Sequence, residues 1–237
     1  QGIRVICVAG GHVEGTVITA KSRWKGCPEA CDLKDILGQF RNFKIGVPGK
    51  GSIHDVILKE SLERFHLEKQ VEVVNFPWAD LVTEAVVHDE VAAAFGTPAL
   101  AVAVRRFAGG KVLYPPSKLW PDNPSYGIVV DAGYLERGRE VIKQFLIIHE
   151  EATGFIREKP REAAKMISDY VGIVDAPFVL ETLVSFSSSA SEPAGTLMVL
   201  PILTREGFFK SFSFINAATV VLFRTAIFSR VSPFFTT

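Results

Sequence analysis

The stretch FKIGVPGKGSIHDVI, residues 43–57, decides the fold of this chain. Its apolar beginning, residues 43–47, predicts a buried strand, and residues 48–51, PGKG, predict a glycine-rich turn. Ser52 then begins a predicted helix. One face of that helix is predicted to be apolar through Ile53, Val56 and Ile57. A strand, a tight turn and a helix in this order are typical of α/β folds.

Strands and helices also alternate on both sides of this stretch. Further strands are predicted at residues 3–9, 15–20, 71–76, 91–95, 111–114 and 127–130. Further helices are predicted at residues 32–37, 80–87 (capped by Asp80), 99–107, about 136–157, and 161–171. The alternation predicts an open, largely parallel α/β sheet followed by a mostly helical region.

Composition excludes several classes of protein. The 237 residues are 48% hydrophobic, and 26 Lys+Arg balance 26 Asp+Glu, so the net charge is zero. One or two domains with a sizeable core are expected. Without a block of basic residues, nucleic acid is not expected as a partner. The longest apolar stretch, residues 212–223, is shorter than the ~20 residues that span a bilayer, and residues 1–5 show no targeting signal.

The three cysteines do not predict a metal site. The spacing Cys27-x3-Cys31 differs from the paired C-x2-C units of a zinc ribbon, so no structural metal is expected. Cys7 lies in an apolar run and is predicted to be a small buried residue. Cys27 and Cys31 flank Pro28 in a polar loop, where either a local disulfide or two free thiols fit the sequence.

The turn at residues 48–51 is the best candidate for chemistry. The helix N-terminus after it presents unpaired N–H groups and a positive dipole, which favour an anion. Ser52 with Asp55 three residues later also resembles a capping box, so the alternative is an ordinary capped helix. A Walker loop would need Lys at Ser52, and G-x-G-x-x-G would need Gly at His54. Neither ATP nor NAD is implied, and no cofactor is expected.

Histidines and aromatic residues give weaker signals. Four histidines are predicted to lie at the surface or its boundary: His54, His66, His88 and His149. Only His12, in a loop after the first strand, is a candidate ligand neighbour. Trp78 and Tyr126 flank strands and are candidates for a pocket wall, because ligands of α/β sheets gather at strand ends. Packing at loop edges is the alternative for both.

Five segments, taken in order, resemble a known family. They are KIGVPGKGS (44–52), VAAAFGTP (91–98), KVL (111–113), LWP (119–121) and FIREKPREAA (155–164). Together they resemble the nitrate/sulfonate/taurine (NMT1/THI5-like) family of ABC-transporter substrate-binding proteins, over residues 3–184. The resemblance implies a type II periplasmic-binding-protein-like α/β fold of two lobes with the ligand between them. It also implies a first lobe that is incomplete, because family members carry a signal peptide and a βαβ portion ahead of residue 3.

The resemblance implies a division of the chain. Residues 1–31 would belong to lobe one, 32–125 to lobe two, and 126–184 to lobe one again. Residues 185–237 depart from the family, being first Ser-rich and then, from residue 207, carrying eight Phe and no acidic residue. This atypical tail is expected to pack poorly and to be cut first by proteases.

The resemblance also implies a function. The chain would be the extracytoplasmic solute-binding component of an ABC importer for a small anion such as a sulfonate, nitrate or taurine. It would be a monomer, periplasmic or lipid-anchored, that works with permease subunits in the membrane and performs no enzymatic reaction. The implied ligand-binding residues are Gly11, His12, Gly51, Ser52, Ile53, Trp78, Thr97 and Tyr126.

Two alternatives stay open at this point. One is an enzyme on the same fold, of the thiamine-pyrimidine or menaquinone-pathway type, for which His12 and Lys50 are the candidate reactive residues. The other is the effector-binding domain of a transcription regulator.

Overall fold

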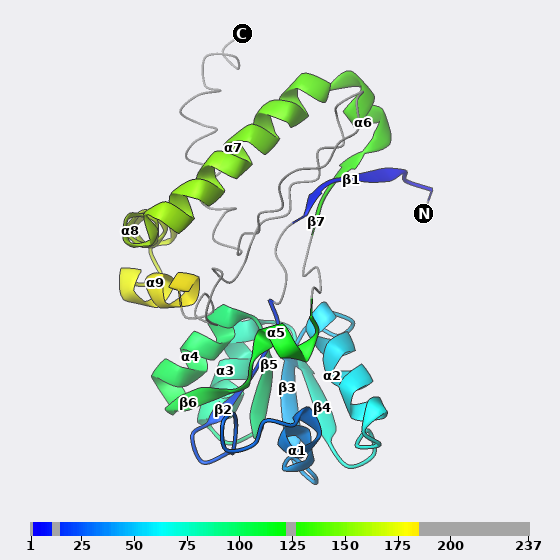
Figure 1. Cartoon of the computed structure of the whole chain (residues 1–237), viewed down its shortest axis with the longest axis vertical. Helices are drawn as coiled ribbons and strands as arrows, with labels where there is room; N and C mark the ends of the chain where they lie inside the picture. The colour runs from blue at the N-terminus through cyan, green and yellow to red at the C-terminus, as the bar shows by residue number, and fades with distance from the viewer. Residues whose placement is uncertain (1, 11–14, 122–126, 185–237) are drawn as a thin grey trace. The chain divides into compact units, whose positions relative to one another are not determined.

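The computed structural model describes residues 2–10, 15–121 and 127–184 (Figure 1). The chain divides into a first unit, Gln1–Val13 with Pro124–Thr237, and a second unit, Glu14–Asn123. The predicted first boundary, after residue 31, is wrong. Residues 14–31 belong to the second unit because strand β2 (Val17–Lys21) pairs inside its sheet. The tail, residues 185–237, lies outside the described residues.

The second unit is built on a five-stranded sheet of order β4-β3-β5-β2-β6. Its other strands are β3 (Lys44–Pro48), β4 (Glu72–Phe76), β5 (Ala93–Gly96) and β6 (Gly110–Tyr114). Strand β3 pairs in parallel with β4 and β5, whereas β2 pairs antiparallel with β5 and β6. The sheet is therefore mixed: four strands run in one direction, as predicted, and β2 runs against them.

Helices cover both faces of this sheet (Figure 1). Helices α1 (Leu33–Gly38) and α2 (Ile53–Arg64) pack on one face, and α3 (Ala79–Val87) and α4 (Pro98–Ala108) on the other. Alternate residues of β3 face opposite layers, with Ile45 and Val47 toward α1 and α2. Gly46 faces α3 so closely that a Cβ there would lie 2.9 Å from Val82. The short α5 (Pro116–Leu119) follows β6.

Helix α2 begins where the sequence predicts but turns a different face to the core. Ser52 is its N-cap, and the Ser52 hydroxyl accepts a hydrogen bond from the Asp55 amide. Val56, predicted to be buried, is 43% exposed. The buried face is shifted to Asp55, Ile57, Leu58, Ser61 and Leu62, because two leucines further along the helix fix it. In α3 the N-cap is Trp78, and Asp80, predicted to be the cap, lies in the first turn.

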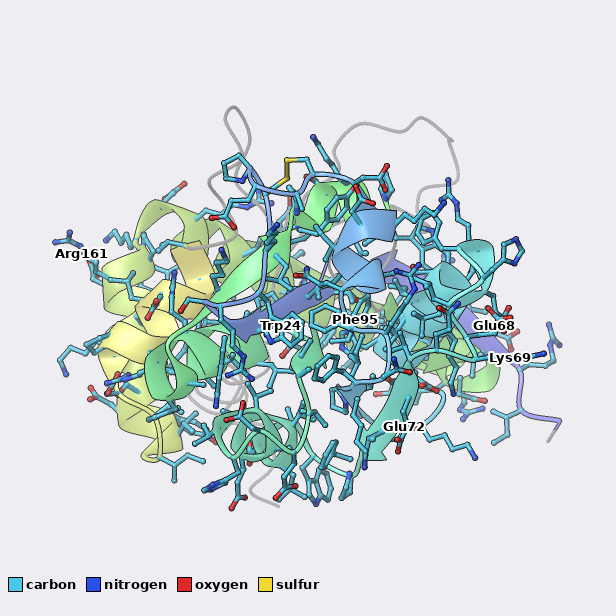
Figure 2. The ribbon with its side chains drawn as sticks, turned by 90° about the horizontal axis from the view of Figure 1, so that it is seen from below. Trp24, Glu68, Lys69, Glu72, Phe95 and Arg161 are labelled. Atoms are coloured by element: carbon cyan, nitrogen blue, oxygen red, sulfur yellow. A yellow bond between two sulfur atoms is a disulfide. The ribbon has the colours of Figure 1, made fainter. Side chains whose placement is uncertain are left out.

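A disulfide joins Cys27 and Cys31 in the loop between β2 and α1 (Figure 2). The Cys27 amide donates a 2.9 Å hydrogen bond to the carbonyl of Leu113 in β6. Upstream in the loop, the Trp24 ring contacts Phe40, with 4.7 Å between ring centroids. Of the two arrangements that the sequence left open, the structure shows the local disulfide, in a loop that lies along the edge strand β6.

The first unit contains a two-stranded antiparallel sheet and four helices among its described residues. Strands β1 (Val5–Gly10) and β7 (Gly127–Asp131) pair with each other. The helices are α6 (Ala132–Arg137), α7 (Arg139–Glu158), α8 (Pro160–Val171) and α9 (Ala176–Val184). The single helix predicted at 136–157 is divided at Gly138, the C-cap of α6.

Two predictions in the first unit are wrong. Cys7 is exposed, because strand alternation turns Ile6 and Val8 toward the helices and Cys7 away. His149, predicted to lie at the surface or its boundary, is 3% exposed, because it lies on the inner face of α7. Among the described residues, none of the helices combines the length and the apolar character needed to cross a membrane.

Candidate functional site

The second unit gathers several chain ends along one edge of its sheet. Pro48 at the end of β3 pairs with Phe76 at the end of β4, and Gly96 at the end of β5 pairs with Val17 at the start of β2. We call this the carboxyl edge. Helices α2, α3 and α4 each begin within a few residues of it, so three helix N-termini lie at one side of the sheet. Such edges bind ligands in open α/β sheets.

The glycine-rich turn at this edge is held in a fixed conformation. Gly49 and Gly51 have φ of 77° and 75°, in the left-handed region that favours glycine. The Gly49 amide donates to the Phe76 carbonyl at 2.7 Å, and the Ser52 hydroxyl donates to the Pro48 carbonyl at 2.9 Å. The turn is therefore tied to both β3 and β4.

The amides of the turn differ in what they can offer a ligand. The Gly51 amide donates to the Asp55 carboxylate at 2.8 Å, and the Ser52 amide donates to the Gly49 carbonyl at 3.2 Å. Within the described residues, the amides of Ile53 and His54 in the first turn of α2 donate no hydrogen bond. Of the predicted ligand residues Gly51, Ser52 and Ile53, only Ile53 has an amide that donates no hydrogen bond within the described residues. The sequence did not single out the His54 amide.

The carboxylate of Asp55 lies buried behind this turn, 3% exposed. Besides the Gly51 amide it accepts hydrogen bonds from Lys59 Nζ at 2.8 Å and Asn75 Nδ2 at 3.0 Å. Burial alone raises the pKa of Asp55. The hydrogen bonds from Asn75 and Lys59 lower that pKa by more, so it lies below its ordinary value and the group is charged at neutral pH.

A second polar contact joins α2 to the beginning of β2. The Thr16 hydroxyl and His54 Nδ1 lie 2.8 Å apart. Burial lowers the pKa of His54 to about 4, so the imidazole is neutral at physiological pH. His54 lies at the boundary between core and surface, as predicted, but the sequence did not assign it a place at the carboxyl edge.

The other predicted site residues of the second unit also lie at the carboxyl edge. Trp78, directly after β4, is 70% exposed, so its indole is available to a ligand and is not part of the core. Thr97 caps α4 and accepts a 3.3 Å hydrogen bond from the Leu100 amide. Gly11, His12 and Tyr126 lie outside the described residues, in the segments that contain the boundaries between the units.

Sequence reasoning missed Thr16, Asn75 and the burial of Asp55. Their partners lie far along the chain: Thr16 meets His54 and Asn75 meets Asp55. Only the capping-box spacing of Ser52 and Asp55 gave a local signal. Within the described ranges, no group of three or more His, Cys, Asp or Glu side chains could hold a metal ion.

Comparison with known proteins assigns the family. The model of the NMT1-like family matches residues 1–169. The chain belongs to the NMT1-like family. The resemblance found in the sequence is thereby confirmed. No protein among the curated ones matches the chain.

Several solved structures of ligand-binding proteins are similar to this chain in fold. The aliphatic sulphonate binding protein of Escherichia coli is 15% identical with a TM-score of 0.64, over 99% of this chain and 71% of that one. The zinc-bound ligand-binding component of an ABC-type import system from Staphylococcus aureus is 14% identical with a TM-score of 0.58, over 98% of this chain and 69% of that one. The nitrate-binding protein of Synechocystis is 15% identical with a TM-score of 0.60, over 77% of this chain and 49% of that one.

At these identities the likeness concerns the fold. The α/β, periplasmic-binding-protein-like architecture predicted for this family member is confirmed. The chain spans about seven tenths of the first two structures and about half of the third.

Proposed function

We propose that this chain is the solute-binding component of an ABC importer and that it binds a small anion at the carboxyl edge of the second unit. The observation that carries the proposal is the start of α2. There a rigid glycine-rich turn precedes two amides, of Ile53 and His54, that donate no hydrogen bond within the described residues. Amides at a helix N-terminus favour negative charge.

Binding at this turn needs support from other groups. A helix N-terminus contributes at most ~2 kcal/mol to holding one charge, whereas micromolar affinity requires about 8 kcal/mol. Within the second unit, Thr97 supplies a polar side chain and Trp78 an exposed indole. The remaining predicted contacts, Gly11, His12 and Tyr126, complete the proposed ligand set.

The Ser52 hydroxyl has a different part from the one the sequence suggests. Its hydrogen is donated to the Pro48 carbonyl, and its oxygen accepts from the Asp55 amide. A hydroxyl has one hydrogen to donate, so an anion would have to displace the bond to Pro48. Ser52 therefore supports the site mainly as the cap of α2.

The exposed indole of Trp78 favours a ligand with an apolar part. A stacked ring stabilises a carbon body and does little for an inorganic ion. An organic sulfonate or carboxylate therefore fits this edge better than nitrate does. Of the proteins of similar fold, two are by name periplasmic binding proteins for sulphonate and nitrate, and the third is the ligand-binding component of an ABC-type import system. These names support a chain that works outside the cytoplasm and delivers its ligand to a membrane permease.

The proposal is tested by removing one amide hydrogen. Ser52 has φ −66° and ψ 162°, a conformation compatible with a following proline, and proline is tolerated at the first helical position. Ile53→Pro therefore removes the Ile53 N–H while α2 is retained. Titration calorimetry with methanesulfonate, taurine, acetate and nitrate should show micromolar binding of at least one organic anion by the wild-type chain.

The matched control is Ile53→Ala, which loses the same side chain but keeps the amide hydrogen. Ile53→Pro should bind the anion at least about tenfold more weakly than Ile53→Ala, because a hydrogen bond to a charged group is lost. Equal affinities of the two variants would move the site away from α2. Absence of binding to all four anions would refute the proposed function.

A further inference from the structure

A buried negative charge lies directly behind the proposed anion site. The Asp55 carboxylate is 3% exposed and occupies the third position of α2, next to the amides that would hold the ligand. Burying a carboxylate is costly unless hydrogen bonds and charge compensate for the lost hydration. Here three donors from three places do so: the glycine-rich turn, the next turn of α2, and β4.

The two oxygens of Asp55 have separate partners. Oδ2 accepts from the Gly51 amide and from Lys59 Nζ, both at 2.8 Å, and Oδ1 accepts from Asn75 Nδ2 at 3.0 Å. Gly51 has a φ of 75°, and a Cβ there would meet nothing within 4 Å. Among the described residues the Gly51 amide donates to Asp55 alone, so this bond sets the direction of its N–H, while Gly49 and Ser52 tie the rest of the turn to the sheet.

Two of the charges around the start of α2 cancel each other. Asp55 is negative, Lys59 is positive and only partly exposed, and the neighbouring imidazole of His54 faces Thr16. Lys50, at the tip of the turn, adds one exposed positive charge. Asp55 and Lys59 together therefore add no net charge behind the two amides of α2, and Lys50 leaves one exposed positive charge at the turn.

We propose that Asp55 is a positioning residue that fixes the glycine-rich turn and limits the bound anion to a single negative charge. This inference rests on the anion site of the proposed function. The buried carboxylate repels a dianion twice as strongly as a monoanion, whereas its hold on Gly51 serves both ligands alike. The ratio of the two affinities therefore separates the charge of Asp55 from its structural part.

Methanesulfonate and sulfate are suitable probes, since they are similar in size and shape and differ by one charge. The wild-type chain should bind methanesulfonate more tightly. Asp55→Asn keeps the shape and removes the charge, so the affinity for sulfate relative to methanesulfonate should rise about fivefold to tenfold. Calorimetry, with displacement of methanesulfonate where sulfate binds weakly, measures the ratio.

Two further variants test the same charge balance. Lys59→Met removes the compensating positive charge from a partly exposed side chain, and should shift the ratio in the opposite direction. Asn75→Ala removes one donor without changing any charge, and should weaken both anions by a similar factor. Tryptophan fluorescence checks that each variant is folded.

The hydrogen bond between the Gly51 amide and the Asp55 carboxylate can be tested without a ligand. Asp55→Asn should increase the hydrogen-exchange rate of the Gly51 amide and shift its NMR resonance, because a charged acceptor is replaced by a neutral one. An unchanged Gly51 amide, or an unchanged affinity ratio in both Asp55→Asn and Lys59→Met, would overturn the inference alone. If the wild-type chain binds neither probe, the proposed function fails and this inference fails with it.

Discussion

The two units bury their apolar residues to different degrees. In the second unit a sheet covered on both faces takes residues such as Phe95, Ile45 and Leu58 out of contact with water (Figure 2 shows Phe95 in the interior). In the described part of the first unit, a two-stranded sheet and its helices leave the strand residues Val5 and Val129 each 57% exposed. A sheet with helices on one face has no second layer to bury its outer side chains. Stability should therefore be concentrated in the second unit.

The chain carries its own probe for this comparison. All three tryptophans, Trp24, Trp78 and Trp120, belong to the second unit. Tryptophan fluorescence therefore follows the unfolding of the second unit, whereas circular dichroism at 222 nm also follows the long helices of the first.

The largest effect is expected from truncating a core residue of the second unit. Phe95→Ala should lower the free energy of unfolding by about 3–5 kcal/mol, since Phe95 is fully buried in the core formed with α1 and α2 and its removal leaves a cavity there. Ile142→Ala in the first unit should cost about 2 kcal/mol, at the low end for such changes. Urea unfolding measures both, and equal losses would contradict the difference between the units.

Acid should lower the stability of each unit, because each contains one histidine that is protonated more readily in the unfolded chain. Burial lowers the pKa of His54 and of His149 to about 4, against about 6.5 in the unfolded chain. Below pH 6.5 the unfolded state binds protons that the folded state does not, so the free energy of unfolding falls until about pH 4. The loss is on the order of 3 kcal/mol for the well-buried His149 and smaller for His54.

His149→Gln should flatten this pH dependence in the dichroism transition, and His54→Gln should flatten it in the fluorescence transition. Unfolding curves at pH 7 and pH 4.5 are sufficient, because carboxylates with lowered pKa values titrate below that range. A His149→Gln chain that loses as much stability as the wild type would show that His149 is already hydrated.

Reduction of the disulfide should affect the second unit alone. Opening Cys27–Cys31 should cost about 2 kcal/mol, at the low end for disulfides because the closed loop is short. The fluorescence midpoint in urea should fall on addition of dithiothreitol. Cys7→Ser, which removes the exposed thiol of the first unit, should leave that midpoint and its response unchanged. A midpoint insensitive to reductant would mean that the loop stays on β6 without the bond.

The smallest effects should differ in sign between the units. Gly46→Ala places a Cβ 2.9 Å from Val82 and should destabilise the second unit by about 1 kcal/mol. Gly154→Ala, inside α7, meets nothing within 4 Å and should stabilise the first unit by about 0.5–1 kcal/mol. Thermal unfolding compares the two, and a stabilising Gly46→Ala would show that the α3 layer can give way.

Local patterns in the sequence were sufficient to predict most elements. The strand predicted at 43–47 is β3 at Lys44–Pro48, and Ser52 caps α2 as expected, because apolar runs and caps act over neighbouring residues. The place of β2 between β5 and β6 was not predictable, since strand order depends on pairings between distant segments. The buried face of α2 was predicted wrongly because Val56 was counted in the apolar pattern. Leu58 and Leu62 face the core instead and turn Val56 outward.

The sequence predicted the backbone of the candidate site but not the contacts between its polar side chains. The glycine-rich turn and the helix start follow from spacing alone. The burial of Asp55 depends on Asn75, twenty residues further along the chain, and the place of His54 depends on Thr16, directly before β2. Polar contacts of this kind are decided by the tertiary structure, and a single sequence carries no trace of them.

The position of β2 has a consequence for biosynthesis. This strand is the first of its sheet to leave the ribosome, yet both of its neighbours, β5 and β6, are made much later, and Ile18 pairs with Tyr114. At usual rates of synthesis, β2 stays without its neighbours for roughly 5–20 s. During that time its apolar residues are exposed to solvent or held by a chaperone. The sheet of the second unit can close only after β6 has emerged.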